Sequence, residues 1–263
     1  MLRLRFASAL ILIPVILGSV YFGGLVFFVA VTFALLVAGW EFFDMARRAG
    51  HCPSMLTGLV LIALIAWNSY SPNDWLRPIV TAALLVTLTV GIFRHGDGWL
   101  TGWAYTFAGV LYVGWIGSYF MLVRALPNGM LWTTYALLIA WATDTGAYLA
   151  GTYFGKHGFF TKISPKKTWE GAIGGWLAAV VVAVALGALV DVELPILHRI
   201  LFGFGLAIAG TIGDLAESLF KRQTGVKDSS NIIPGHGGLL DRIDSLLFAA
   251  VFTYYYLIWI LRV

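Results

Sequence analysis

The sequence predicts an all-α integral membrane protein with about nine transmembrane helices and a cytoplasmic N-terminus. Composition is the first observation behind this prediction: of 263 residues, 60% are hydrophobic and 11% are charged, and the mean hydropathy is +0.86. An ordinary soluble domain carries about 25% charged residues, so too little polar surface is available to coat a globule. The second observation is a series of long apolar runs. Together they exclude a soluble enzyme, a disordered chain and a nucleic-acid-binding domain, and we expect no nucleic-acid partner.

The first apolar run predicts two helices. No charged residue occurs in the 35 positions between Arg5 and Glu41. One helix of that length would measure about 52 Å, against a hydrocarbon core of about 30 Å. The run must therefore fold back, and Gly23-Gly24 is the expected hinge. Arg3 and Arg5 before an apolar run are also typical of a signal peptide. However, no small-x-small cleavage site precedes Gly23 and a second apolar segment follows, which favours an uncleaved helix.

Seven further apolar stretches complete the nine predicted spans. They are 52–73, 78–93, 98–123, 125–143, 171–190, 200–213 and 245–261. The fourth and eighth spans are short, and the eighth reaches full length if Asp214 and Glu217 are helical. We expect residues 1–263 to form a single polytopic membrane domain, in which 1–125 mainly serves packing and 126–263 carries the catalytic helices and cytoplasmic loops.

Basic residues predict the orientation, because cytoplasmic loops of membrane proteins are enriched in Lys and Arg. Nine spans place 13 of the 17 basic residues on one side and 4 on the other. The larger group is Arg3, Arg5, Arg47, Arg48, Arg94, Lys156, Lys162, Lys166, Lys167, Lys221, Arg222, Lys227 and Arg242. The smaller group is Arg77, Arg124, Arg199 and Arg262.

This bias predicts a multi-pass protein of the cell (inner) membrane with both long loops, at about 154–170 and 221–242, in the cytoplasm. We expect Ser229 and Ser230 to be accessible to reagents from that side. Cys52 is the single cysteine, which excludes an intramolecular disulfide and a zinc site built on several thiolates.

Acidic residues gather at the cytoplasmic level of the predicted spans. If the sixth span begins near Met130, Asp144 lies about 21 Å along it, and Asp214 lies about 23 Å along the eighth span. Asp144 could cap its helix or pair with a loop lysine. An ionisable group inside a span is costly, however, so a functional role is the default hypothesis.

Two more groups of acids accompany them. Asp214, Glu217, Ser218 and Lys221 have i, i+3, i+4, i+7 spacing and share one helix face. A Glu217–Lys221 ion pair would explain two of these residues and leave Asp214 unpaired. Asp241 and Asp244 lie one turn apart, where an N-cap and a first-turn dipole interaction are structural alternatives. Carboxylates from separate helices suit Mg²⁺, which proteins usually hold through one or two carboxylates together with substrate phosphates.

Anion-binding groups are close to these acids in the sequence. The segment Ser164-Pro-Lys-Lys-Thr-Trp-Glu-Gly contains Lys166 and Lys167, and a helix is expected to start near Thr168. Pro234-Gly-His-Gly-Gly can bring backbone N–H groups close to an anion, although the loop lysines also fit ordinary positive-inside charge. Acids and donors together favour phosphoryl or nucleotidyl transfer between a lipid and a soluble cytoplasmic reactant.

The string Ser218-Leu-Phe-Lys-Arg-x4-Lys-Asp-x5-Pro-Gly-His-Gly-Gly-x2-Asp-Arg-x-Asp resembles the signature of phosphatidate cytidylyltransferases (CDP-diacylglycerol synthases). Asp144-Thr-Gly-Ala and the segment from Ser164 to Gly171 resemble other segments of that family. The specific similarity covers about 141–171 and 210–246 of the chain.

The resemblance implies the reaction CTP + phosphatidate → CDP-diacylglycerol + pyrophosphate, by Mg²⁺-assisted attack of the lipid phosphate on the α-phosphorus of CTP at the cytoplasmic leaflet. It also implies contact with membrane lipid, a monovalent cation such as K⁺ beside the Mg²⁺, and a homodimer. The implied catalytic residues are Asp144, Asp214, Asp241, Asp244 and Lys167, with Asp214, Asp241 and Asp144 as metal ligands. The implied substrate-binding residues are Ser164, Lys166, Lys167, Thr168, Glu217, Ser218, Lys221, Arg222, Lys227, Asp228, His236, Gly237, Gly238 and Arg242.

The attacking phosphate is already anionic near pH 7, so no general base is required; we therefore expect His236 to contact the loop or a substrate. Two alternatives remain. A lipid kinase or a CDP-alcohol phosphotransferase is one, although the Asp-Gly-x2-Ala-Arg run of the latter is not in the sequence. An ion-coupled transporter is the other, although the acids lie at one face rather than at the midplane.

Overall fold

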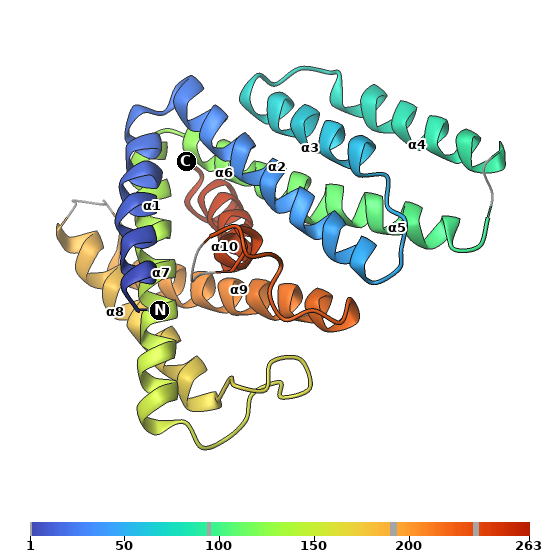
Figure 1. Ribbon diagram of the computed structural model, residues 1–263. Coiled ribbons are helices and arrows are strands. Elements are labelled where there is room, and N and C mark those ends of the chain that lie inside the picture. Colours follow the sequence, from blue (N-terminus) through green and yellow to red (C-terminus); the bar gives the residue numbers. More distant parts are fainter. Residues whose placement is uncertain (1, 94–95, 190–193, 234–236) are drawn as a thin grey trace. The chain divides into compact units, whose positions relative to one another are not determined.

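The structure is a computed structural model that describes residues 2–93, 96–189, 194–233 and 237–263, with side chains from residue 10 onward (Figure 1). In chain order the helices are α1 (Leu2–Phe22), α2 (Gly24–Arg48), α3 (Met55–Tyr70), α4 (Leu76–Phe93), α5 (Trp99–Gly109), the π-helical η1 (Val110–Trp115), α6 (Ile116–Ala125), α7 (Gly129–Phe154), α8 (Trp169–Leu189), α9 (Ile196–Gln223), α10 (Leu240–Tyr255) and the π-helical η2 (Tyr256–Leu261). Within the described ranges, β-pairing is limited to isolated bridges at Gly158–Thr168 and Ile233–Gly237.

The helices confirm the all-α membrane class. Among the described residues, 6 helices are long and apolar enough to cross a membrane: α2, α4, the continuous α5–η1–α6, α8, α9 and the continuous α10–η2. The apolar part of α1 and the helix α3 are shorter, and α7 has 26 residues and carries Asp144. The exact number of nine crossings therefore stays a prediction.

The predicted hinge in the first apolar run is present. α1 ends at Phe22 and α2 begins at Gly24, and φ is +61° at Gly23 and +49° at Gly24. Only glycine adopts such angles readily. The guanidinium of Arg124, at the end of α6, occupies the space that a Cβ on Gly23 would need, and its Nε donates to the carbonyl of Val20 at 2.9 Å. Gly23 is therefore required both by the turn and by this close approach.

The chain divides into two compact units. The first unit consists of 1–125 and 223–241, and the second of 126–222 and 242–263. The segment 223–241 thus belongs with the N-terminal helices, although its motif places it with the catalytic half in the sequence. The single polytopic domain stays a prediction.

In the second unit, α7 and α8 lie side by side (Figure 1), and small residues bring them together. α8 buries a small residue at every fourth position: Gly171, Gly175, Ala179, Ala183 and Gly187. A Cβ on Gly175 would lie 2.8 Å from the carbonyl oxygen of Thr143, and one on Gly171 would lie 3.0 Å from that of Ala147. Membrane helices pack through such small residues because their backbones can then approach closely. This contact places the middle of α7, with Asp144, beside the start of α8.

Candidate active site

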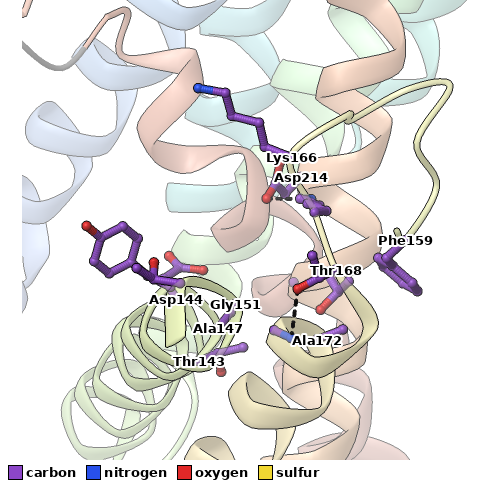
Figure 2. A pocket seen from close by; sticks show the side chains of 15 residues that line it. Thr143, Asp144, Ala147, Gly151, Phe159, Lys166, Thr168, Ala172 and Asp214 are labelled. Carbon is purple, nitrogen blue, oxygen red and sulfur yellow. Dashed lines mark hydrogen bonds and ion pairs between the residues drawn. The ribbon is translucent and has the colours of Figure 1, made fainter. Parts of the chain in front are cut away.

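A pocket of about 400 Å³ lies within the second unit, bordered by α7, α8, α9 and the segment that precedes α8. Ligand-binding pockets are typically about 300–1,000 Å³. Asp144 from α7, Asp214 from α9, and Lys166, Lys167 and Thr168 from the preceding segment all line it (Figure 2). Five residues that the sequence predicts as functional therefore come together at one cavity.

Lys167 and Asp214 form an ion pair across this pocket. The Nζ of Lys167 lies 2.6 Å from Oδ2 of Asp214, and the two side chains are 24% and 38% exposed. The hydroxyl of Ser218, one turn along α9, donates to Oδ1 of Asp214 at 3.4 Å. The pairing with a loop lysine that the sequence suggests for Asp144 thus occurs at Asp214, which the sequence leaves unpaired. An anionic ligand can compete for the lysine, and a cation can compete for the carboxylate.

Asp144 and Asp244 are two further carboxyl groups in this unit. Asp144 is exposed, and it interacts electrostatically with Asp214 and Lys167. Asp244 is buried on α10, and it interacts electrostatically with Asp214 and Asp144. α9 and α10 can approach here because a Cβ on Gly213 would lie 2.5 Å from the carbonyl oxygen of Asp244.

The donors of the pocket fit a magnesium ion that is shared with a substrate. Asp144 and Asp214 offer carboxylate oxygens from two helices at one cavity. In the part of the chain that the structure describes, no cluster of three or more His, Cys, Asp or Glu could hold a metal ion without further ligands. Mg²⁺ is usually held by one or two carboxylates plus substrate phosphates, and Asp144 and Asp214 would supply the carboxylates.

The segment before α8 has the predicted helix start. Oγ1 of Thr168 accepts from the N–H of Gly171 at 3.2 Å, and its carbonyl accepts from Ala172 at 3.0 Å, as in an N-cap. The Thr168 hydroxyl is therefore engaged with the helix. Ser164 lies in a turn, where its carbonyl accepts from the N–H of Lys167 at 3.2 Å. Lys166 is exposed, and in Figure 2 its side chain extends away from Thr168.

Two charged side chains hold this segment in place. Oε2 of Glu170 accepts from the N–H groups of Lys156 and His157 at 3.1 and 3.2 Å. Arg222, predicted to bind substrate, donates through Nε to the carbonyl of Ile163 at 3.0 Å. Arg222 thus supports the segment that carries the lysines, and direct contact with a substrate stays a prediction.

Glu217 and Lys221 form the ion pair that their spacing allows. Glu217 is fully buried on α9, and Lys221 one turn later pairs with Oε2. Ser218 is also buried. The two charges neutralise each other inside the unit, which is the structural role considered for them above. Their predicted contact with substrate stays untested.

Asp241 lies in the first unit, in the first turn of α10. Its Oδ2 accepts from the N–H and the hydroxyl of Ser229, at 3.0 and 2.9 Å, and from the N–H of Gly238 at 2.8 Å. These bonds tie the start of the helix to the loop before it. α10 begins at Leu240, so Asp241 lies within the helix rather than at its N-cap.

The glycines of the loop are needed by the loop itself. Gly237 has φ +82°, and a Cβ there would lie 2.8 Å from Oδ2 of Asp241. A Cβ on Gly238 would overlap the hydroxyl of Ser229 and lie 2.6 Å from Oε1 of Glu41. Close packing within the protein therefore accounts for both glycines. Their binding to an anion stays a prediction, and His236 lies outside the described residues.

The remaining loop residues differ in exposure. Ser229 and Ser230 are 0% and 4% exposed, so the expectation that reagents reach them is wrong: both hydroxyls point to buried carboxylates. Lys227, Asp228 and Arg242 are exposed, and their contact with a substrate stays a prediction.

Sequence reasoning missed Glu41. This residue of α2 is fully buried and binds both ends of the loop that precedes Asp241. A signal was present, because Glu41 ends the uncharged first run and lies within a span, where an acid is a functional hypothesis by default.

The similarity to known proteins extends over almost the whole chain. The model of the cytidylyltransferase family matches residues 3–260. A phosphatidate cytidylyltransferase of Staphylococcus haemolyticus is 34% identical over 252 residues, which cover 94% of this chain and 95% of the relative. A phosphatidate cytidylyltransferase of Staphylococcus aureus is 35% identical over the same share of both chains. The match includes the N-terminal helices as well as the polar segments, and the chain belongs to the cytidylyltransferase family.

Proposed function

We propose that this chain is a phosphatidate cytidylyltransferase, which converts CTP and phosphatidate to CDP-diacylglycerol and pyrophosphate. The names of its relatives support this activity. The structural observation that carries it is the pocket in which Asp144 and Asp214 lie with Lys166 and Lys167. Such a pocket offers ligands for a cation and for phosphates at the same place.

The reaction makes one bond and breaks one. An oxygen of the lipid phosphate attacks the α-phosphorus of CTP, and the bond from that phosphorus to the oxygen bridging the β-phosphate breaks. Pyrophosphate leaves with the bonding electrons. The attacking phosphate is already anionic near pH 7, so no side chain has to remove a proton. Repulsion between the two anions is the main barrier, and the protein lowers it by positioning and charge neutralisation.

Different residues of the pocket have different proposed roles in this reaction. Lys166 and Lys167 bind phosphate oxygens of CTP, and Lys167 exchanges its contact with Asp214 for one with the nucleotide. Asp214 and Asp144 would hold Mg²⁺, and the family resemblance implies Asp241 as a further ligand and K⁺ as a second cation. Bound Mg²⁺ would supply positive charge to the phosphate oxygens. Lys227, Asp228 and Arg242 are proposed as substrate contacts because they are exposed.

The membrane determines how the two substrates meet. The protein has multiple membrane helices, and we propose that its active site faces the cytoplasm, where 13 of the 17 basic residues are expected. CTP then arrives from solution, and phosphatidate enters sideways from the leaflet with its head group at the level of Asp144. The homodimer stays a prediction from the resemblance.

Pyrophosphate release from the purified protein in detergent tests this function. We expect release only when CTP, phosphatidate and Mg²⁺ are all present, with CDP-diacylglycerol formed in equal amount. Release from CTP alone would contradict the proposed transfer. Phosphorylation of a lipid by a nucleotide would support a lipid kinase, and Mg²⁺-independent solute uptake into vesicles would support a transporter.

A further inference from the structure

Glu41 is a fully buried carboxylate on the N-terminal helix α2. Burial of a charge within a membrane span is costly unless hydrogen bonds satisfy it. Four donors do so, and all belong to the segment that leads into α10, 188 to 199 residues further along the chain. They are the hydroxyls of Ser229 and Ser230 and the N–H groups of Leu239 and Leu240.

The two carboxylate oxygens share these donors evenly. Oε1 accepts from the Ser230 hydroxyl at 2.5 Å and from the N–H of Leu239 at 2.9 Å. Oε2 accepts from the Ser229 hydroxyl at 3.2 Å and from the N–H of Leu240 at 2.6 Å. The first N–H groups of a helix have no partner within it, and a negative charge is favourable there. Glu41 thus caps the start of α10 and draws both ends of the loop to one point.

The same hydroxyl links Glu41 to Asp241. Oγ of Ser229 lies 3.2 Å from Oε2 of Glu41 and 2.9 Å from Oδ2 of Asp241, and its single hydrogen is shared between the two carboxylates. Gly238 fills the narrow space between them, since its N–H donates to Asp241 and a Cβ there would lie 2.6 Å from Oε1 of Glu41. Any shift of the Glu41 carboxylate would therefore displace the donors that orient Asp241.

We propose that Glu41 is a positioning residue for Asp241. It fixes the loop 229–240 against α2, and the loop in turn orients the Asp241 carboxylate. This inference rests on the proposed function, because it requires Asp241 to serve the cytidylyl transfer. It gives the N-terminal helices a role in the reaction in addition to packing.

Glu41→Gln is the sharpest test. Glutamine has the same size, but its NH₂ group cannot accept a hydrogen bond from a backbone N–H, whereas a serine hydroxyl can rotate to accept one. We expect faster hydrogen exchange in the substrate-free protein at whichever of Leu239 and Leu240 faces the NH₂ group, because the other N–H keeps its acceptor oxygen. We also expect kcat to fall about 10–100-fold, the range for misplacing a reactive group by about 1 Å, and the Mg²⁺ concentration for half-maximal rate to rise.

Asp44→Asn is the matched control, since Asp44 lies one turn further along α2 and pairs with Arg48. It should leave hydrogen exchange and kcat as in the wild type. If Glu41→Gln does not fold, Ser230→Ala removes a single donor and should change both readouts in the same direction by a smaller factor.

Three outcomes separate this inference from the proposed function. Wild-type exchange at Leu239 and Leu240, or wild-type kcat, in Glu41→Gln would overturn the positioning role while Asp241→Asn remained inactive. Full activity of Asp241→Asn would overturn it as well, by removing Asp241 from the reaction. Absence of pyrophosphate release from the wild type would instead contradict the proposed function, which the exchange measurement does not depend on.

Discussion

At the scale of the residue, the pocket is defined by opposite charges that already neutralise each other. Lys167 and Asp214 are 2.6 Å apart, and both remain partly exposed, so water screens the pair and a ligand can reach both groups. A triphosphate would attract Lys167, and a divalent cation would attract Asp214. Binding of both ligands together would separate the pair without leaving either charge unpaired. The proposed roles of Lys167 and Asp214 predict this exchange.

Replacing Asp214 tests the metal assignment. Asp214→Asn keeps the size of the side chain but removes the charge that a cation requires. We expect pyrophosphate release to fall at least about 100-fold, as when a group that stabilises transition-state charge is lost, while the protein stays folded and membrane-inserted. Asp241→Asn should behave in the same way. Asp97→Asn is the control, because Asp97 is exposed. Wild-type-like activity of Asp214→Asn at saturating Mg²⁺ would contradict the metal assignment.

The basic residues can be separated in the same manner. Lys166→Ala and Lys167→Ala should each lower kcat/KM for CTP by about 1–3 kcal/mol, because each removes a charged hydrogen bond to a phosphate. Lys227→Ala is expected to do so as well. Arg48→Ala is the control, since Arg48 pairs with Asp44 on α2. Equal losses in all these variants would mean that the lysines act only as positive-inside charge.

At the scale of the element, the stripe of small residues on α8 explains how the pocket is built. Gly171 and Gly175 let α8 approach α7 at Ala147 and Thr143, and Ala183 packs against Gly203 of α9. One helix thus joins the two helices that carry Asp144 and Asp214. Polar bonds reinforce the packing, since the hydroxyl of Tyr135 donates to the carbonyl of Ala183 at 2.6 Å.

Widening this contact should destabilise the protein. A Cβ on Gly175 would already lie 2.8 Å from the carbonyl of Thr143, so we expect Gly175→Val to cost about 1–3 kcal/mol, as overpacking of a tight core does. Thermal unfolding in detergent measures the loss. Leu177→Ala on the exposed side of α8 is the control, because Leu177 is 62% exposed. A Gly175→Val protein as stable as Leu177→Ala would show that the close approach is not required.

The elements that the sequence predicts are those that chain length and the bilayer determine. The uncharged first run is too long for one span, so the length of the run alone predicts that the chain turns back within it. The turn at Gly23-Gly24 is confirmed. The start of α8 after Thr168 follows from the capping preference of threonine. The contacts of Glu41 could not be predicted in this way, because neither the hydrophobic periodicity nor the spacing of motif residues relates α2 to a loop near residue 230. The burial of Ser229 and Ser230 was missed for the same reason.

At the scale of the whole molecule, two compact units share the chain, and the segment 223–241 leaves the second unit to pack with the first. The sequence predicts a single polytopic domain in which 1–125 mainly serves packing and 126–263 carries the catalytic helices and loops. It does not predict the return of 223–241, because a contact between distant segments has no local pattern. Asp214 and Asp241 thus belong to different units. In the sequence they are close to one motif, since the signature begins shortly after Asp214 and contains Asp241.

The orientation of the molecule gives the last prediction. The basic residues predict that the segments 155–168 and 223–239 face the cytoplasm, whereas the connection between α3 and α4 faces outside. Thr161, Asn231 and Asn73 are exposed in these three places. In a Cys52→Ser background, we expect membrane-impermeant maleimide to label Thr161→Cys and Asn231→Cys only in inverted vesicles, and Asn73→Cys only in intact cells. The exposed Cys52 has to be removed first because it would react itself. Labelling of Asn231→Cys from outside intact cells would reverse the topology. CTP from the cytoplasm could then no longer reach the pocket, and the account of how the two substrates meet would fail with it.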